Sequence, residues 1–327
     1  MRRIFVIALL IFPLRAHAVT IDWVTVGGPG NAADTTGDGA VADVYRIAKY
    51  EVTNAQYEEF LNAVAATDTY GLYSTSMDSS YGGITRSGGS GSYEYSAIVD
   101  REDMPVNYVS FYDSLRFTNW LHNGQPGFLG YDQIGDPMFD PVPQDENSTE
   151  DGAYTFSGPT SVGSRNAGAT IFLTSEDEWY KAAYYDPTSE SYNPYPFADG
   201  FNGAVYQAPP GTTTHSANCD DAVGDLTDVG SYTGSASPNW TFDQGGNVWE
   251  RNEASIGSWR ILRGGNFDDS ASVLAASSRS VADPTYEDSD IGFRVATVPE
   301  PDAWLLGVTA LLVVAGLAAV PRRRSLH

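Results

Sequence analysis

The chain has 327 residues and a formal net charge of −24, with 42 Asp and Glu against 18 Lys and Arg. Because nucleic-acid binding draws its affinity from basic side chains that neutralise phosphates, this charge argues against a nucleic-acid partner. A single cysteine, Cys219, excludes an internal disulfide. The 33 Gly and 18 Pro predict a loop-rich fold, and the 20 Tyr and 7 Trp supply apolar area for its core.

Residues 1–18 have the pattern of a secretory signal peptide. Two arginines precede an apolar run from Ile4 to Leu14, and Ala16-His17-Ala18 forms an Ala-x-Ala cleavage site. The alternative is a buried N-terminal strand or helix. We expect the signal to be removed and the folded chain, from residue 19 onward, to be exported from the cytoplasm.

The first two predicted helices have clear start signals. Thr53 and Gln56 have the spacing of a capping box, and Ser110 with Asp113 has the same arrangement. Asn123-Gly124 is a helix stop signal for the second helix. The apolar stripes at helical spacing are Tyr57, Phe60, Leu61 and Val64 in the first helix, and Leu115, Phe117, Trp120 and Leu121 in the second.

A third helix is predicted from Thr174 or Ser175, because either hydroxyl can cap the acidic first turn formed by residues 176–178. Its expected buried side chains are Trp179, Ala182 and Ala183. Apolar alternation and β-branched residues predict strands at 44–50, 171–173, 259–263 and 292–296. Two segments rich in Gly, with Ser or Pro, at 81–96 and 125–164, are expected to be surface insertions.

Six short runs resemble the formylglycine-generating enzyme (sulfatase-modifying factor) family. They occur in the family's order, and they are residues 49–57, 104–110, 173–179, 245–250, 263–267 and 292–294. The resemblance implies one α+β domain over residues 19–297, with the irregular, loop-rich fold of the C-type-lectin-like class.

Two loops are candidate calcium sites, because calcium prefers six to eight oxygens from carboxylates, amides and main-chain carbonyls. In the first loop the ligands would be the carboxylates of Asp243 and Glu250 and the main-chain carbonyls of Gly246 and Val248. The resemblance implies calcium there, and the family has an amide where this chain has Asp243.

The second candidate site resembles the family's other calcium loop, although the segment before its aspartate is shorter. Its ligands would be Asn218, the carbonyls of Cys219 and Val223, and either Asp221 or Asp220. The alternative for both loops is ordinary turn chemistry of Asn, Asp and Gly. A third loop, residues 34–39 with Asp43, is interpreted as a turn because Tyr45 stands where an EF-hand has an acidic ligand.

The family's oxidation of a substrate cysteine uses two thiolates a short way past the Arg-Gly-Gly run, where they hold copper. Residues 268–279 contain no cysteine, and Cys219 is alone, so copper chemistry is not expected. Related members bind iron through several histidines, whereas the expected domain contains only His122 and His215. We therefore assign no catalytic residue. The alternative is an enzyme that uses groups around Arg263, Ser277, Ser278 and Arg279.

The C-terminal residues 298–327 resemble a PEP-CTERM sorting signal of Gram-negative bacteria. Pro299-Glu300-Pro301 precedes an uncharged run at 303–320, long enough for one membrane helix, and three arginines follow. The resemblance implies processing by an exosortase. The alternative is an ordinary membrane anchor. Either interpretation places the protein in the cell envelope or at the cell surface, anchored by the helix or released.

These features predict a calcium-stabilised binding or matrix module. Tyr70, Tyr73, Tyr93 and Tyr95 would line a groove for a glycan or peptide, or else lie folded beneath their loops. Two alternatives remain open: an oxidoreductase of the formylglycine-generating type or another enzyme, and a structural surface spacer.

Overall fold

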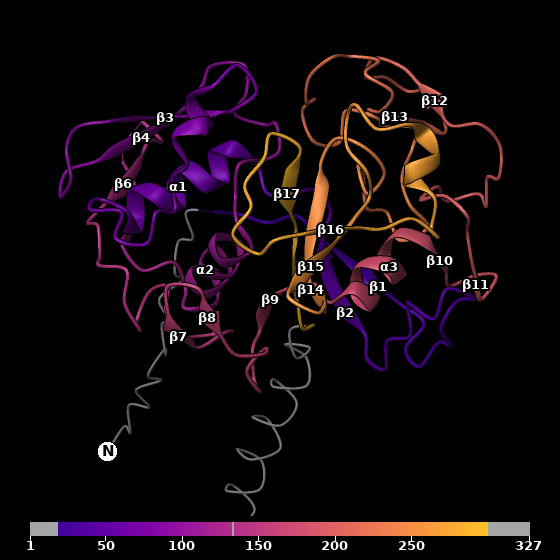
Figure 1. The fold of residues 1–327 in the computed structure, drawn as a ribbon, viewed down its shortest axis with the longest axis horizontal. Helices are drawn as coiled ribbons and strands as arrows, with labels where there is room; N and C mark the ends of the chain where they lie inside the picture. Colours follow the sequence, from indigo (N-terminus) through magenta and orange to yellow (C-terminus); the bar gives the residue numbers. More distant parts are fainter. Residues whose placement is uncertain (1–18, 133, 300–327) are drawn as a thin grey trace, which may run out of the picture.

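The computed structural model describes residues 19–132 and 134–299 (Figure 1). The predicted signal peptide, residues 1–18, and the predicted membrane helix, residues 303–320, lie outside these ranges. Among the helices within them, none combines the length and apolar character needed to cross a membrane.

Two four-stranded sheets form the centre of the fold. The first, in the order β1-β2-β18-β9, is antiparallel and pairs strands from the two ends of the described chain. The second, in the order β16-β15-β14-β17, contains one parallel pair, β14 with β17. The bounds are β1 Trp23–Val26, β2 Tyr45–Ala48, β9 Ile171–Leu173, β14 Trp249–Ile256, β15 Trp259–Arg263, β16 Ser280–Ala282, β17 Ile291–Phe293 and β18 Val295–Thr297.

The prediction of one strand over 292–296 was wrong, because the segment divides into β17 and β18 on either side of Arg294. These two strands belong to different sheets, so Arg294 lies where the sheets meet. Its fully buried side chain hydrogen-bonds Glu250 of β14 and the main-chain carbonyl of Ala48 at the end of β2. The predicted strands at 171–173 and 259–263 are confirmed, and that at 44–50 is shorter.

All three predicted helices are confirmed. They are α1 Asn54–Val64, α2 Phe111–His122 and α3 Glu176–Tyr184, each preceded by a capping box, with Ser175 as the cap of α3. Figure 1 shows α1 and α2 on one side of the second sheet and α3 on the other. The predicted apolar stripes are buried, and the rings of Phe60, Phe117 and Phe293 pack edge to face.

The two predicted insertions carry short hairpins that sequence reasoning missed. They are β3 Ile84–Ser87 with β4 Glu94–Ala97, β5 Phe128–Tyr131 with β6 Pro137–Phe139, and β7 Phe156–Gly158 with β8 Ser161–Val162. The remaining elements are β10 Tyr185–Asp186, β11 Ser191–Tyr192, β12 Tyr206–Gln207, β13 Ser216–Ala217, and the 3₁₀ turns η1 Thr75–Asp78 and η2 Ala271–Leu274.

The predicted tyrosine groove is not formed as a whole, because Tyr73 and Tyr95 are buried beneath their loops. Tyr95 donates its hydroxyl proton to the carbonyl of Ala65 at 2.8 Å, and Tyr73 donates to Ile84 at 3.3 Å. For these two residues the alternative interpretation is confirmed. Buried tyrosines of this kind stabilise the fold, since each ring is packed and each hydroxyl is satisfied.

Candidate functional site

The segment from Asp243 to Glu250, which ends the connection after β13 and runs into the start of β14, contains the first predicted calcium set. Its backbone takes left-handed conformations at Asp243, Gly246 and Asn247, with φ of 59°, 89° and 65°. A Cβ on Gly246 would lie 2.3 Å from the carbonyl oxygen of Asn218, so this position requires glycine. The loop therefore packs closely against the segment that contains the second predicted site.

Glu250 lies fully buried at the centre of this region. Arg294 donates from Nε to Oε2 and from Nη2 to Oε1, both at 2.6 Å, which is the bidentate geometry of a strong ion pair. Trp179 of α3 donates its indole N–H to Oε2 at 2.7 Å. Both carboxylate oxygens are thus hydrogen-bonded, and any cation at Glu250 would share them with Arg294.

Two further carboxylates approach this ion pair. Glu51 is buried, and its Oε2 lies 3.9 Å from Nη2 of Arg294 without a hydrogen bond within the described ranges. Burial and the charge of Asp243 raise the pKa of Glu51 well above its ordinary value. Burial raises the pKa of Asp243 to about 6, against the lowering effect of the Gly230 N–H, which it accepts at 2.5 Å. Three carboxylates therefore surround one guanidinium.

Sequence reasoning missed Glu51, although it belongs to the run 49–57 that carries the family resemblance. Asn247 connects Glu51 to the loop, because its Nδ2 donates to Oε1 of Glu51 at 3.3 Å. The same side chain accepts the N–H of Thr227 at 3.0 Å through Oδ1. Periodicity along a sequence does not indicate such contacts, which join residues far apart in the chain.

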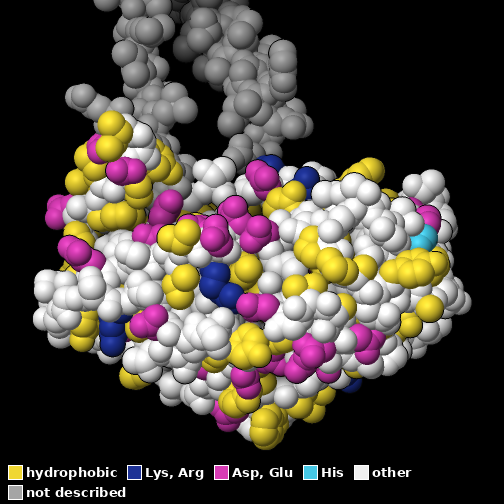
Figure 2. All heavy atoms as spheres, turned by 90° about the horizontal axis from the view of Figure 1, so that it is seen from above, with side chains coloured by type: hydrophobic (Ala, Val, Ile, Leu, Met, Phe, Trp, Pro, Cys, Tyr) yellow, Lys and Arg dark blue, Asp and Glu magenta, His cyan; other side chains and the backbone are white. Residues whose placement is uncertain are grey.

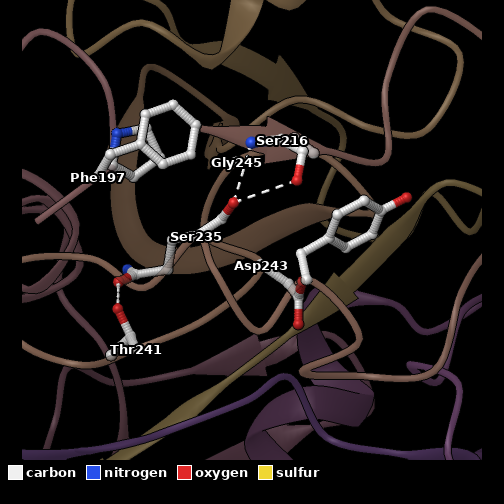
Figure 3. Close-up of a pocket in the computed structure, with 10 residues that line it drawn as sticks. Phe197, Ser216, Ser235, Thr241, Asp243 and Gly245 are labelled. Atoms are coloured by element: carbon white, nitrogen blue, oxygen red, sulfur yellow. Dashed lines mark hydrogen bonds between the residues drawn. The ribbon is translucent and has the colours of Figure 1, made fainter. Parts of the chain in front are cut away.

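Asp243 also borders a small polar cavity, shown in Figure 3. The cavity has a volume of about 10 Å³, roughly the space of one water molecule or ion. Ser216, Ser235 and Thr241 present hydroxyls to it, and Ser216 donates its N–H to Oγ of Ser235 at 2.9 Å. The other predicted ligands of this set, Gly246, Val248 and Glu250, do not line it.

The second predicted set is more dispersed. Asn218 is buried, and its Nδ2 donates to the carbonyl of Asp225 at 2.9 Å and to Asn247 at 3.1 Å. Its Oδ1 is buried and accepts no hydrogen bond from the described chain. The carbonyl of Cys219 accepts the N–H of Ala222 at 3.2 Å, and Val223 is 39% exposed.

The two predicted loops therefore contact each other through Asn218 and Asn247, which the sequence did not indicate. Of the acidic residues in the second loop, Asp220 accepts the N–H of Ala271 at 3.2 Å, whereas Asp225 forms a bidentate pair with Arg101 at 2.7 and 3.0 Å. Across residues 19–132 and 134–299, no three or more His, Cys, Asp or Glu side chains are grouped to hold a metal ion by themselves. Main-chain carbonyls and amide oxygens would have to complete either set.

The segment 268–279, which follows the Arg-Gly-Gly run, forms the turn η2 and exposed bends. Arg263 lies buried beneath it and donates to Glu176 at 2.8 Å and to the carbonyls of Ala276 and Ser278 at 2.9 and 2.7 Å. Asp38 adds a second carboxylate partner at 2.5 Å. Arg263 thus links this segment, through hydrogen bonds and ion pairs, to α3 and to the loop that precedes β2.

Cys219 is fully buried, and its cluster contains Phe197, Val205, Ala217 and Leu274 of η2. Burial raises the pKa of the Cys219 thiol to about 12. Since the thiolate is the reactive form and the metal ligand, a raised pKa and burial both disfavour reaction of this thiol and its binding of a metal. The interpretation of Cys219 as a small buried side chain is confirmed.

The remaining candidates have local partners. Asp34 accepts the N–H of Thr35 at 2.6 Å and the hydroxyl of Tyr180 at 2.5 Å, in a turn closed by hydrogen bonds to Asp38 and Gly37. His122 contacts Thr170 at 2.9 Å. His215 pairs with Asp199 at 2.7 Å, and its ring stacks on Phe201 with 3.8 Å between centroids.

Acidic side chains outnumber basic ones on the face shown in Figure 2, in line with the net charge of −24. Apolar side chains on this face lie in small patches separated by polar surface.

Comparison with known proteins supports the fold. Among solved structures the chain is similar to the crystal structure of CarF, at 20% identity and a TM-score of 0.53, over 86% of this chain and 99% of that one. It is also similar to Treponema denticola variable protein 1 (18%, TM-score 0.49, 85% and 95% covered) and to PvdO from Pseudomonas aeruginosa (16%, TM-score 0.45, 85% and 92%). No curated protein matches the chain.

A family description, the sulfatase-modifying factor enzyme 1-like domain, matches residues 25–298. The similarity to CarF supports the same kind of fold, which in this chain is a single domain of sheet and loop with few helices. Since the match spans most of the sequence, the chain belongs to the sulfatase-modifying factor enzyme 1-like (FGE-sulfatase) family.

Proposed function

We propose that this protein is a non-catalytic member of its family, an exported binding or matrix module that calcium stabilises. The observation that supports it most is the lack of an accessible pair of cysteine thiols. The segment 268–279 contains no cysteine, and the one thiol of the chain, Cys219, is buried with a raised pKa. A copper-thiolate oxidase needs two accessible thiolates, and this chain does not supply them.

The calcium part of the proposal is supported by unbalanced negative charge and by unsatisfied oxygens. Asp243 and Glu250, with the carbonyls of Gly246 and Val248, would hold one ion close to Glu51, whose buried Oε2 has no hydrogen-bond partner in the described chain. A divalent cation would neutralise the charge that three carboxylates leave around Arg294.

A second ion would be held by Asn218, Cys219, Asp221 and Val223. Its support is the buried Oδ1 of Asn218, which accepts nothing from the described residues. Amide oxygens of this kind are ordinary calcium ligands. The ion's contribution would be structural, since it would join the loop that follows β13 to the loop that precedes β14.

Export and surface sorting complete the proposal. The apolar segment before Ala16-His17-Ala18 supports secretion, and Pro-Glu-Pro with the apolar run 303–320 and three arginines supports recognition by an exosortase. We also propose that the fold belongs to the C-type-lectin-like class, which is associated with ligand binding. The glycan or peptide ligand remains a prediction.

The test is to incubate the purified domain with copper, oxygen and a cysteine-containing peptide, and to weigh the peptide by mass spectrometry. We expect the peptide to keep its thiol, whereas a family enzyme with the cysteine pair, used as positive control, forms the aldehyde. Aldehyde formation by this protein would contradict the proposal. If that occurred, loss of the product in Cys219→Ser would locate the chemistry at the buried thiol.

A further inference from the structure

A cleft of about 370 Å³ opens between α2, β14, β15 and the loop that follows β8. Its apolar side chains are Phe111, Leu115 and Val162, and its charged side chains are Arg165, Glu253 and Arg260. The volume lies in the range of small-molecule sites, which are concave, largely apolar and equipped with a few polar groups.

Arg260 differs from most arginines of this chain because it has no carboxylate partner among residues 19–132 and 134–299. Its guanidinium stacks on Phe111, 3.9 Å from the ring centroid, and Nη1 donates to the main-chain carbonyl of Glu253 at 2.7 Å. Nε and Nη2 donate no hydrogen bond to the described chain. The side chain is half-buried, so its charge is partly desolvated without a carboxylate hydrogen-bonded to it within the described ranges, which favours an anion at this position.

The charged side chains on the opposite wall of the cleft already have hydrogen-bond partners. Arg165 donates to Oε1 and Oε2 of Glu253 at 2.8 and 2.9 Å, and to Glu178 at 2.7 Å. The hydroxyl of Tyr154 also donates to Oε1 of Glu253. Because three donors already reach the carboxylate of Glu253, an ammonium group would have to compete with Arg165 for it, and an amine is not the expected ligand.

Arg165 shares its charge with Glu253 and Glu178, so Arg260 is the charged lining residue whose guanidinium has no carboxylate hydrogen-bond partner among the described residues. A carboxylate carries one negative charge and matches the fork of a guanidinium. A phosphate monoester carries nearly two negative charges and would lie close to the carboxylate of Glu253, which disfavours it. The neighbouring Phe111, Leu115 and Val162 suit an apolar group attached to the carboxylate.

We propose that this cleft binds a carboxylate joined to an apolar body, either a small organic acid or the C-terminal residue of a peptide, with Arg260 as its anchor. This inference names a ligand class for the binding module proposed above. It rests on that proposal only for the claim that the domain binds a ligand. Its failure would leave the peptide-oxidation result and the calcium dependence unchanged, so the proposals fail separately.

The experiment is a titration of the full-length protein, followed by NMR or calorimetry, with four probes. Two are 3-phenylpropanoate and its neutral amide. The other two are a short peptide that ends in phenylalanine with a free carboxylate, and the same peptide with a C-terminal amide. We expect the free acids to bind in the millimolar range, as is usual for ligands of this size, and the amides to bind at least about tenfold more weakly. Binding of one acid only would identify which source the cleft accepts.

The variants are Arg260→Gln, Arg260→Lys and, as a matched control, Arg279→Gln on the exposed segment after η2. We expect the affinity for the acids to fall at least about tenfold in Arg260→Gln, to be intermediate in Arg260→Lys and to be unchanged in Arg279→Gln. Circular dichroism checks that the variants fold. If Arg260→Gln does not fold, the acid and amide pairs on the unaltered protein decide the question. Absence of acid binding up to about 10 mM, or equal binding of acids and amides, would overturn the proposal.

Discussion

The predicted calcium loop, 243–250, and the segment after the Arg-Gly-Gly run, 268–279, have opposite relations to the rest of the molecule. In the first, buried Glu250 and Asn247 contact Arg294, Trp179 and Glu51, residues far away in the chain. In the second, most side chains are exposed or bond to near neighbours, as Ser270 does with Ser272. The first segment is therefore part of the core, and its sequence indicates the fold. The sequence of the second segment could change without loss of the fold.

The largest effect is expected for Arg294→Met. Removing the guanidinium leaves Glu51, Asp243 and Glu250 without their common cation, and breaking a buried pair from one side costs about 3–5 kcal/mol. Urea unfolding measures the change in the free energy of unfolding. The matched control is Arg279→Ala, whose side chain is 44% exposed and lies 3.5 Å from Glu176, with an expected change within about 0.5 kcal/mol. Equal changes in both variants would contradict the assigned difference.

A smaller effect is expected where the second segment touches the core, at Leu274. Leu274→Ala would remove a fully buried side chain from the cluster that contains Cys219, at a cost of about 2–3 kcal/mol. We also expect it to speed the reaction of Cys219 with iodoacetamide, because the new cavity gives the reagent access. Labelling followed by mass spectrometry measures both proteins, with Val273→Ala, in the same turn, as control. Rapid labelling of the unaltered native protein would contradict the burial of this thiol.

The smallest effect concerns a carboxylate that, unlike Glu250, has no cation. Glu59 of α1 has a buried Oε2 that accepts no hydrogen bond within the described chain, and burial raises its pKa to about 7. The folded state therefore holds the proton more tightly than the unfolded state, in which the pKa is about 4.3. Stability should fall as the pH rises from about 4.3 to 7, and this contribution stays lost above pH 7.

Glu59→Gln removes this titration. We expect the variant to be more stable than the unaltered protein at pH 8, by less than about 1 kcal/mol because the group keeps some solvent contact, and equally stable at pH 4. Thermal melts at the two pH values measure the difference, with Glu94→Gln, at an exposed position of β4, as control for the substitution itself. The prediction would be wrong in sign if Glu59→Gln were less stable than the unaltered protein at pH 8 while the two were equally stable at pH 4.

The local elements could be predicted from the sequence because their signals are local. Thr53, Ser110 and Ser175 mark the helix starts by capping boxes, and the apolar stripes give the buried faces. The break at Arg294 and the role of Glu51 could not be predicted, since each depends on a partner on a distant strand or loop. Likewise, nothing in the order of residues indicates that Arg260 lacks a carboxylate partner.

For the candidate site, the sequence indicated both loops but not their contact. Asn218 and Asn247 join them through side-chain amides, a pairing that only the folded chain creates. Asp243 and Glu250 both lie close enough to Arg294 to interact with its charge, and the ligand sets themselves stay predictions. The lack of cysteine in residues 268–279 can be read directly from the sequence, because it does not depend on how the chain folds.

The claim that the first segment still holds a metal is tested most directly by thermal unfolding of the protein in excess calcium and in excess chelator. Because an ion that binds only the native state stabilises it, a hundredfold excess over the Kd adds about 2.7 kcal/mol. We expect a higher melting temperature in calcium and a much smaller difference in Asp243→Ala, with Asp243→Asn retaining most of it because the amide still offers an oxygen. The same melting temperature in calcium and in chelator would contradict the account.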